Sequence, residues 1–246
     1  MNRRIGTKVG FLSVRLPSFF ADRDRFRRKA GEDDRGLSIA LMDSYPCLRD
    51  KKASTEYPRD YVYHVGWAAR RLAQTRPAKH VDISSSLWFA TVVSAFVPVD
   101  YYEYRPSGIV LPGFTEKKCD LGQLPFEDGS VPSLSCMHVI EHIGLGRYGD
   151  EIDPQGDKKA CRELTRVLAR GGDLFFVSPV GRPRIEYNAH RIYSYGMVLD
   201  LFPGLELMET ALLPTKGDTG FIENAGAKEM DVEEYGCGCF WFRKKK

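Results

Sequence analysis

"AKHVDISSSLWFATVVSAFVPVDYYEYRP", residues 78–106, decides the fold class of this chain. The segment "HVDIS" predicts a short buried strand, "LWFATVVSAF" the helix after it, and "VDYYEY" a second strand. Pro98 ends the helix between the two strands. A strand, a crossing helix and a second strand form the basic unit of a parallel α/β sheet.

Helices and strands continue to alternate on both sides of this unit. Before it, residues 61–77 predict a helix whose core face is Val62, Val65, Ala69 and Leu72. After it, "VPSLSCMHVI" (residues 131–140) predicts a buried strand. "LELMET" (205–210) and "CFWF" (239–242) predict two more. The pattern therefore indicates an α/β fold with a mostly parallel sheet covered by helices on both faces.

Two further helices have clear boundaries in the sequence. In "KKACRELTRVLARGGDLFFVSPV" (158–180), Gly171 and Gly172 are expected to stop a helix before the strand "DLFFVS". In "SYGMVLDLF" (194–202), Ser194 is a plausible N-cap. The residues predicted to face the core in these helices are Ala160, Cys161, Leu164, Val167, Leu168, Met197, Val198, Leu201 and Phe202.

The composition is that of a soluble globular protein, with 43% hydrophobic and 28% charged residues in 246. No run approaches the ~18 apolar residues that a membrane helix requires, and no cleavage site follows the early apolar stretch. We therefore expect a cytoplasmic protein without an integral membrane segment. Its six cysteines should remain thiols there. "CGC" (237–239) could be half of a metal site, but no second Cys/His pair has suitable spacing, so we assign no metal ligands.

Residues 1–55 are predicted to be a basic irregular arm, and residues 56–246 the α/β domain. Residues 1–35 hold ten Lys or Arg against five Asp or Glu, whereas the net charge of the whole chain is only +3. A basic arm can contact anionic lipid, nucleic acid or an acidic protein. A solvated terminus explains the same residues, so we expect no nucleic-acid partner.

A nucleoside site is predicted where the first two strands end. In open α/β sheets, ligands bind beyond the carboxyl ends of the strands. Ser84, Ser85 and Ser86 form the first of these turns. Glu103 follows Asp82 by roughly the twenty residues at which an acid reaches ribose hydroxyls in dinucleotide folds. Serine is small enough for this turn but adopts positive φ less easily than glycine.

Two longer segments carry a family resemblance. "CDLGQLPFEDGSVPSLSCMHVIEHIGLG" (119–146) and "ELTRVLARGGDLFFVSPV" (163–180) resemble the second half of class I S-adenosylmethionine-dependent methyltransferases. More narrowly, the chain looks like a member of DUF268, an uncharacterised bacterial-type group of that superfamily. The segments that carry this second resemblance are "HVDISSSLWF", "EHIGLGRYGD", "PRIEYNAHRIYS" and "EYGCGCFWF". The resemblance covers about residues 45–243 and implies a Rossmann-like fold with a seven-stranded sheet.

The resemblance implies S-adenosylmethionine as cofactor and gives a set of binding residues. Asp82 and the turn at Ser84 and Ser86 correspond to the loop that holds the methionine moiety, and Glu103 to the acid on the ribose. Asp120 and Leu121 match the position that contacts adenine, and His138 to His142 lie where the methyl group meets the acceptor. The departure from the superfamily pattern is at Ser84 and Ser86, where glycine is usual.

The polar residues near these positions are candidates for acid–base and acceptor-binding roles. His142 follows a strand end beside Glu141, which can orient the imidazole and raise its basicity. Glu141 and His190 are further candidate catalytic groups. The polar segment 183–194 suits a polyhydroxylated or anionic acceptor, and the glycine-rich loop 144–157 can act as a lid. The acceptor-binding candidates are Arg147, Tyr148, Arg184, Asn188 and Arg191.

The leading hypothesis is a methyltransferase that modifies a small polar acceptor, such as a hydroxyl of a carbohydrate or sugar nucleotide. The alternative is a catalytically inactive protein of the same fold that serves as a binding or scaffold module in glycan assembly. A third reading is a metal-dependent enzyme that uses His142, His190 and nearby acids. It has the residue types but lacks ligand spacing on one element. The sequence does not specify the oligomeric state.

Overall fold

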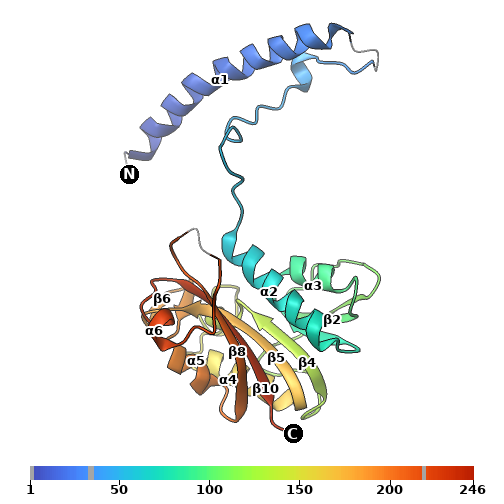
Figure 1. Cartoon of the computed structure of the whole chain (residues 1–246), viewed down its shortest axis with the longest axis vertical. Coiled ribbons are helices and arrows are strands. Elements are labelled where there is room, and N and C mark those ends of the chain that lie inside the picture. Colours follow the sequence, from blue (N-terminus) through green and yellow to red (C-terminus); the bar gives the residue numbers. More distant parts are fainter. Residues whose placement is uncertain (1–2, 33–35, 218–219) are drawn as a thin grey trace. The chain divides into compact units, whose positions relative to one another are not determined.

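The computed structural model describes residues 3–32, 36–217 and 220–246. The chain divides into two compact units, Met1–Tyr57 and Pro58–Lys246, with the division two residues after the predicted boundary (Figure 1). Among the described residues, no helix combines the length and the apolar character needed to cross a bilayer. Each unit is described separately.

The first unit contains a long helix rather than an irregular arm. Helix α1 spans Arg3–Lys29 and is followed by two short 3₁₀ helices, η1 (Ala30–Glu32) and η2 (Leu41–Asp43). Arg and Lys favour helices almost as strongly as Ala, and the basic residues of the last turn complement the helix dipole. The apolar residues of this segment do not recur regularly at three- and four-residue intervals. The sequence pattern therefore did not predict a helix here.

The second unit is built on an eight-stranded sheet with the order β3-β2-β1-β4-β5-β10-β8-β9. The first five strands in this order are parallel, whereas β10 runs antiparallel to both β5 and β8. The mostly parallel α/β architecture is confirmed, with eight strands rather than seven because the two-residue β9 extends the edge. The strands are β1 (His80–Ile83), β2 (Val99–Glu103), β3 (Phe114–Lys118), β4 (Val131–Met137), β5 (Leu168–Val180), β8 (Leu205–Leu213), β9 (Ile222–Glu223) and β10 (Gly236–Lys244).

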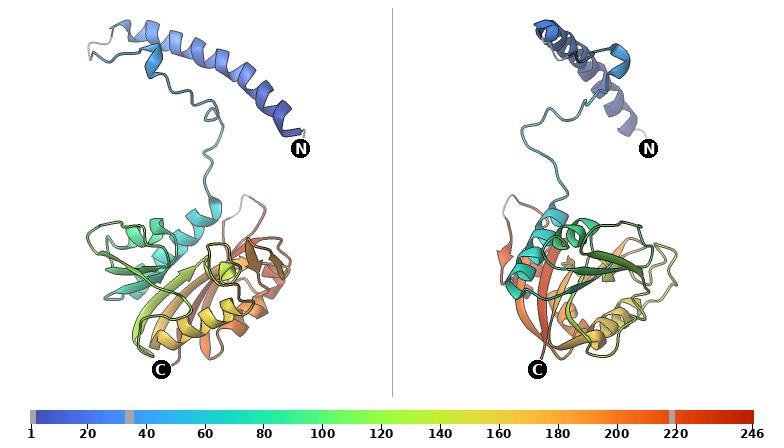
Figure 2. Two further views of the ribbon diagram at one scale, coloured as in Figure 1. Left: turned by 180° about the vertical axis from the view of Figure 1, so that it is seen from behind. Right: turned by 90° about the vertical axis from the view of Figure 1, so that its right-hand side faces the viewer.

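Helices cover both faces of this sheet, as predicted. Helices α2 (Arg59–Thr75) and α3 (Leu87–Val93) pack together on one face. Helices α4 (Gly156–Val167) and α5 (Tyr195–Leu201) pack together on the other, as the side view in Figure 2 shows. Strand β5 alternates accordingly, with Phe175 and Val177 in the core under α2 and Leu174 and Phe176 in the core under α4.

The predicted inward face of α2 is confirmed in part. Leu72 is buried, and Val65 and Ala69 are partly buried against the core. Val62 is 52% exposed, whereas His64, Trp67 and Ala68 are buried. Both sets repeat at three- and four-residue intervals, so periodicity alone does not distinguish them. Burial of the large Trp67 ring rotates the helix toward the second set, and a histidine is thereby brought into the core.

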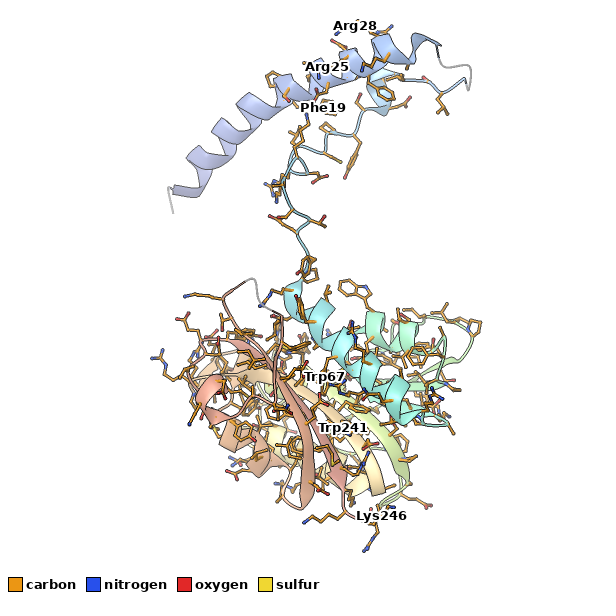
Figure 3. The ribbon with its side chains drawn as sticks, in the orientation of Figure 1. Phe19, Arg25, Arg28, Trp67, Trp241 and Lys246 are labelled. Carbon is orange, nitrogen blue, oxygen red and sulfur yellow. The ribbon has the colours of Figure 1, made fainter. Side chains whose placement is uncertain are left out.

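Contacts to the sheet hold α2 in this orientation. The Trp67 ring lies edge-on to Phe175, which in turn packs against Trp241 of β10. Figure 3 labels Trp67 on the helix and Trp241 on the strand. The indole nitrogen of Trp67 donates to Oε1 of Glu209 at 3.0 Å, and the Arg71 guanidinium binds the same carboxylate oxygen.

The other helices agree with the sequence except at their ends. Helix α4 ends at Val167, before the two glycines, and β5 has already begun at Leu168. Gly171, with φ of +73°, lies inside β5 where the pairing with β4 shifts by three residues, between the pairs Val131–Leu168 and Ser133–Asp173. On α5, Met197 is 44% exposed, whereas Val198, Leu201 and Phe202 are buried as predicted.

Three short elements complete the unit. A 3₁₀ helix, η3 (Ile140–His142), follows β4, and a hairpin of β6 (Arg184–Glu186) and β7 (His190–Ile192) follows β5. A one-turn helix, α6 (Ala227–Met230), precedes β10.

The predicted N-cap of α5 is present, and it gives a stability prediction. The Ser194 hydroxyl accepts a hydrogen bond from the Met197 amide at 3.2 Å. Ser194→Ala is therefore expected to lower the free energy of unfolding by about 1 kcal/mol, because that amide loses its protein partner. Chemical denaturation measures the effect, with exposed Ser54→Ala as the control. Equal stability of the two variants would contradict the capping role.

Candidate functional site

A cavity of about 620 Å³ lies where the parallel strands β1 to β4 end. This is the edge at which open α/β sheets bind their ligands, and the volume suits a small molecule. Seven of the residues predicted from sequence line it together: Ser84, Glu103, Asp120, Leu121, His138, His142 and Tyr148.

The serine turn after β1 adopts the backbone conformation that glycine usually supplies. Ser84 has φ of +54°, in the left-handed region, although an L side chain makes this costly. Its hydroxyl donates to the Tyr102 carbonyl at 3.2 Å, and its amide donates to the same carbonyl at 2.8 Å. Both bonds tie the turn to β2, and the Ser84 side chain is bonded to the protein backbone.

Ser85, the middle residue of the predicted turn, fixes its other side. It is 4% exposed, and its hydroxyl accepts from the Met137 amide at 3.0 Å. Its carbonyl accepts from the Tyr101 hydroxyl at 2.8 Å. Ser86 caps the start of α3 through its backbone and does not line the cavity. A hydroxyl in the middle of such a turn is the only sequence signal for Ser85.

Asp82 supports the turn from beneath instead of lining the cavity. It is completely buried, and its carboxylate accepts from the Ser85 amide at 3.0 Å and from the Ser135 hydroxyl. Ser135 and Ser133 also contact the two ring nitrogens of His80, each at 2.8 Å. Burial raises the pKa of Asp82 to about 7 and lowers that of His80 to about 3.

Two carboxylates stand at the ends of the neighbouring strands. Glu103, the last residue of β2, accepts from the Arg105 amide at 3.1 Å, and its second oxygen lies 3.4 Å from the Tyr101 hydroxyl. Asp120, after β3, accepts from the Gly122 amide at 2.8 Å. Both line the cavity, and each carboxylate keeps lone pairs for a ligand.

His142 is the cavity residue best arranged to act as a base. Its Nδ1 lies 2.7 Å from the Ala189 carbonyl, which can only accept, and 3.2 Å from Nη1 of Arg147, which itself donates to that carbonyl at 2.9 Å. The shorter contact, to the carbonyl, favours the tautomer with the proton on Nδ1 and the lone pair on Nε2. Burial lowers the pKa of His142 below its usual value. The imidazole is therefore neutral at pH 7. Glu141 lies 3.9 Å from Nε2, which is too far for a hydrogen bond, so the carbonyl sets the tautomer.

Glu141 is paired with His138 and does not line the cavity. It is 1% exposed, and its Oε1 accepts from Nδ1 of His138 at 2.9 Å. His138, which follows β4 with φ of +56°, lies at the cavity wall. The predicted pairing of Glu141 with His142 is thus replaced by a pairing with His138.

The remaining candidates from the segment 183–194 lie outside the cavity lining. His190 packs on Tyr235 with Nε2 3.2 Å from Glu186, and Arg184 also binds Glu186, while Asn188 is exposed. Arg191 is 5% exposed and donates to the Ile143 carbonyl at 2.6 Å. The segment 183–194, predicted to be an acceptor-binding loop, contains the hairpin of β6 and β7. The polar contacts of its side chains stabilise this hairpin and the loop after η3.

The glycine-rich loop 144–153 forms one wall of the cavity. Asp150 organises it by accepting from the amides of Gly144 at 2.8 Å and Tyr148 at 3.1 Å. The guanidinium carbons of Arg105 and Arg147 lie 4.7 Å and 5.1 Å from the centroid of the Tyr148 ring, within the range of cation–π contacts. Arg147 also donates to the Ala189 carbonyl but does not line the cavity. The loop therefore reaches the residues that follow β2, as a lid would.

The cavity wall carries more acidic than basic groups. The loop adds Asp150, Glu151 and Asp153 to the two strand-end carboxylates. The cationic side chains of the cavity wall are Arg105 and Lys159, and the Lys159 ammonium lies 2.6 Å from the Asp153 carboxylate. This balance favours cationic or neutral hydroxylated ligands over anionic ones. The sequence analysis missed these loop acids, for which the acidic composition of residues 150–153 was the available signal.

Part of the sequence matches a known protein family. Residues 129–220 match DUF268, described as a Caenorhabditis protein of unknown function, where the resemblance had implied a bacterial-type group. No match to this chain was found among the curated proteins.

Several solved structures share the fold. The N-methyltransferase NodS from Bradyrhizobium japonicum WM9, solved with S-adenosyl-L-homocysteine, is 14% identical with a TM-score of 0.54 over 78% of this chain and 90% of its own. A SAM-dependent methyltransferase from Thermotoga maritima is 19% identical with a TM-score of 0.53 over 76% and 90%. The [4+2]-cyclase SpnF also matches, at 13% identity and a TM-score of 0.54 over 76% and 81%. The chain therefore has the fold of the class I S-adenosylmethionine-dependent methyltransferases, and its residues 129–220 carry the DUF268 sequence pattern.

Proposed function

We propose that this protein is an S-adenosylmethionine-dependent methyltransferase that acts on a small polar acceptor. The observation that carries the proposal is the cavity at the ends of β1 to β4, which brings Ser84, Glu103, Asp120 and His142 together. The fold alone does not establish the reaction, because a protein described as a [4+2]-cyclase shares it.

The residues of the cavity fit the proposed cofactor. The Glu103 carboxylate stands at the end of β2 and can accept hydrogen bonds from both hydroxyls of a ribose. Asp120 and Leu121 offer a polar atom and an apolar side chain for the adenine ring. The acidic wall complements the positive charge of the cofactor. When bound, S-adenosylmethionine supplies an electrophilic methyl group on its sulfonium.

The protein's own contribution is positioning and proton transfer. A methyl group moves in line from sulfur to a nucleophile, so much of the acceleration comes from holding the two partners in register. A hydroxyl acceptor must also lose its proton, and Nε2 of His142 is the basic nitrogen available for this.

We propose a neutral carbohydrate hydroxyl as the acceptor rather than a sugar nucleotide. Carboxylates from the loop 144–153 can accept hydrogen bonds from sugar hydroxyls, whereas the same charges repel a diphosphate. Arg184 and Arg191, the cationic candidates for acceptor binding in the segment 183–194, do not line the cavity.

Formation of S-adenosylhomocysteine tests this proposal. The full chain is incubated with S-adenosylmethionine and with neutral sugars, sugar nucleotides or amines, each compared with a reaction without acceptor. Stimulation by neutral sugars is the expected result. Stimulation only by amines or by sugar nucleotides would overturn the choice of acceptor, and cofactor binding without turnover on any class would favour the scaffold alternative in glycan assembly.

A further inference from the structure

A buried group of three metal-binding side chains lies behind the cavity wall. It consists of His64 on α2, His138 after β4 and Cys237 on β10. One nitrogen of each histidine and the sulfur of the cysteine all lie within 4.8 Å of one another. In the part of the chain that the structure describes, this is the one group of three or more such side chains close enough to share an ion.

In each histidine, one ring nitrogen is bonded to an oxygen and the other is the candidate ligand atom. Nδ1 of His64 lies 2.7 Å from the Asp60 carbonyl, and Nδ1 of His138 lies 2.9 Å from the Glu141 carboxylate. Because both oxygens accept, Nδ1 of each histidine donates and Nε2 is the candidate ligand atom, which in His138 is in contact with Sγ of Cys237. An outer oxygen that fixes the other ring nitrogen is the usual support of a metal-binding histidine.

His64 supplies a second observation that points to a ligand. Its side chain is completely buried, and Nε2 has no hydrogen-bond partner in the described structure. An unpaired imidazole nitrogen in the core costs free energy that a bond to an ion would recover.

One of the three spacings already agrees with a tetrahedral ion, and all three atoms lie within 4.8 Å of one another. Nε2 of His138 lies 3.4 Å from Sγ of Cys237. Ligands at zinc–nitrogen and zinc–sulfur distances of about 2.0–2.3 Å are separated by roughly 3.3–3.7 Å around a tetrahedral centre. His64 and His138 face each other with their ring centroids 5.0 Å apart, and small rotations of the side chains would bring all three atoms to one ion.

We propose that His64, His138 and Cys237 form a binding site for one Zn²⁺ ion. A thiolate and two imidazoles are the ligands that zinc prefers, and the fourth position is left to water or a ligand atom. On binding, the S–H bond of Cys237 breaks, a sulfur–zinc bond forms and the proton passes to solvent, with no change of oxidation state. The ion joins three elements that are distant in sequence, and it does so independently of the proposed methyl transfer.

Cobalt substitution tests this site on the whole chain. Cys47 is exposed, so Cys47→Ala serves as the parent protein and removes a competing thiol. After dialysis against a chelator, titration with Co²⁺ is expected to give one ion per chain, a thiolate-to-cobalt charge-transfer band and intense tetrahedral visible bands. Zn²⁺ should displace the cobalt and raise the melting temperature, because it binds the folded chain.

A matched pair of variants locates the ligand. Cys237→Ala in the parent protein should reduce the charge-transfer band at least tenfold, whereas Cys161→Ala, which removes another fully buried thiol on α4, should retain it. His64→Gln should weaken cobalt binding at least tenfold. No cobalt uptake by the folded parent protein, or a spectrum without the thiolate band, would leave only a hydrogen bond between Cys237 and His138 and overturn the proposal. This outcome is measured on the parent protein, so it does not depend on whether any ligand variant folds.

Discussion

His142→Asn is expected to lower the turnover rate by two to four orders of magnitude on a hydroxyl acceptor. The asparagine amide can still donate to the Ala189 carbonyl, as Nδ1 of His142 does, so the loop after η3 stays in place. What the variant loses is the basic nitrogen at the position of Nε2. Cofactor affinity should change less than threefold, and a steady-state assay together with a binding titration separates the two effects.

His190→Asn is the matched control for this variant. His190 was a further candidate base in the sequence, but it packs on Tyr235 and does not line the cavity. Its substitution should change turnover by less than about tenfold. Wild-type turnover should also fall on the acid side through a pKa below 6.5, because burial lowers the pKa of His142. A larger loss in His190→Asn than in His142→Asn would refute the assignment of the base.

Asp82→Asn is expected to make the stability of the protein less dependent on pH. Burial raises the pKa of Asp82 to about 7 in the folded chain from 3.8, so the folded state binds a proton more tightly than the unfolded state. This stabilisation is complete below pH 3.8 and is lost as the pH rises to 7. The loss amounts to about 1.4 kcal/mol per pH unit, or about 4 kcal/mol in total.

Relative to wild type, Asp82→Asn should therefore gain stability as the pH rises from 4 to 8. Asparagine can accept from the Ser85 amide and donate to Ser135, which keeps the buried network connected. Denaturation of both proteins at each pH measures the difference, and Asp200→Asn, an exposed substitution on α5, should show a flat difference. A difference for Asp82→Asn that stays constant with pH would show that the carboxylate is already ionised in the fold.

Sequence reasoning was most successful where the relevant interactions are local. Alternation of short apolar runs with helical stripes predicted the parallel sheet, and Ser194 predicted the start of α5. On α2, Leu72 was predicted correctly but Val62 was not, because the predicted and the observed inward faces have the same period and only the packing of Trp67 distinguishes them. The two-residue β9 is too short to leave a pattern.

The candidate site divides in the same way. Ser84 follows β1 and Glu103 ends β2, so strand positions placed both at the cavity, whereas Asp120, two residues after β3, came from the family resemblance. Asp82 and Arg191 are polar residues whose burial the sequence does not reveal. The sequence does not reveal the proposed zinc site, because each ligand comes from a different element and no two of them have the short spacing of a recognisable ligand pair. Of the "CGC" pair, only Cys237 belongs to that group.

The most direct test of the central claim is a calorimetric titration of the full chain with S-adenosylmethionine and S-adenosylhomocysteine. Wild type should bind both with micromolar affinity. Glu103→Ala should bind about 100-fold more weakly, since it loses two charge-assisted hydrogen bonds to the ribose. Glu127→Ala, an exposed substitution away from the cavity, should bind as wild type does. No binding by wild type at millimolar cofactor, or equal affinity in Glu103→Ala, would contradict the account.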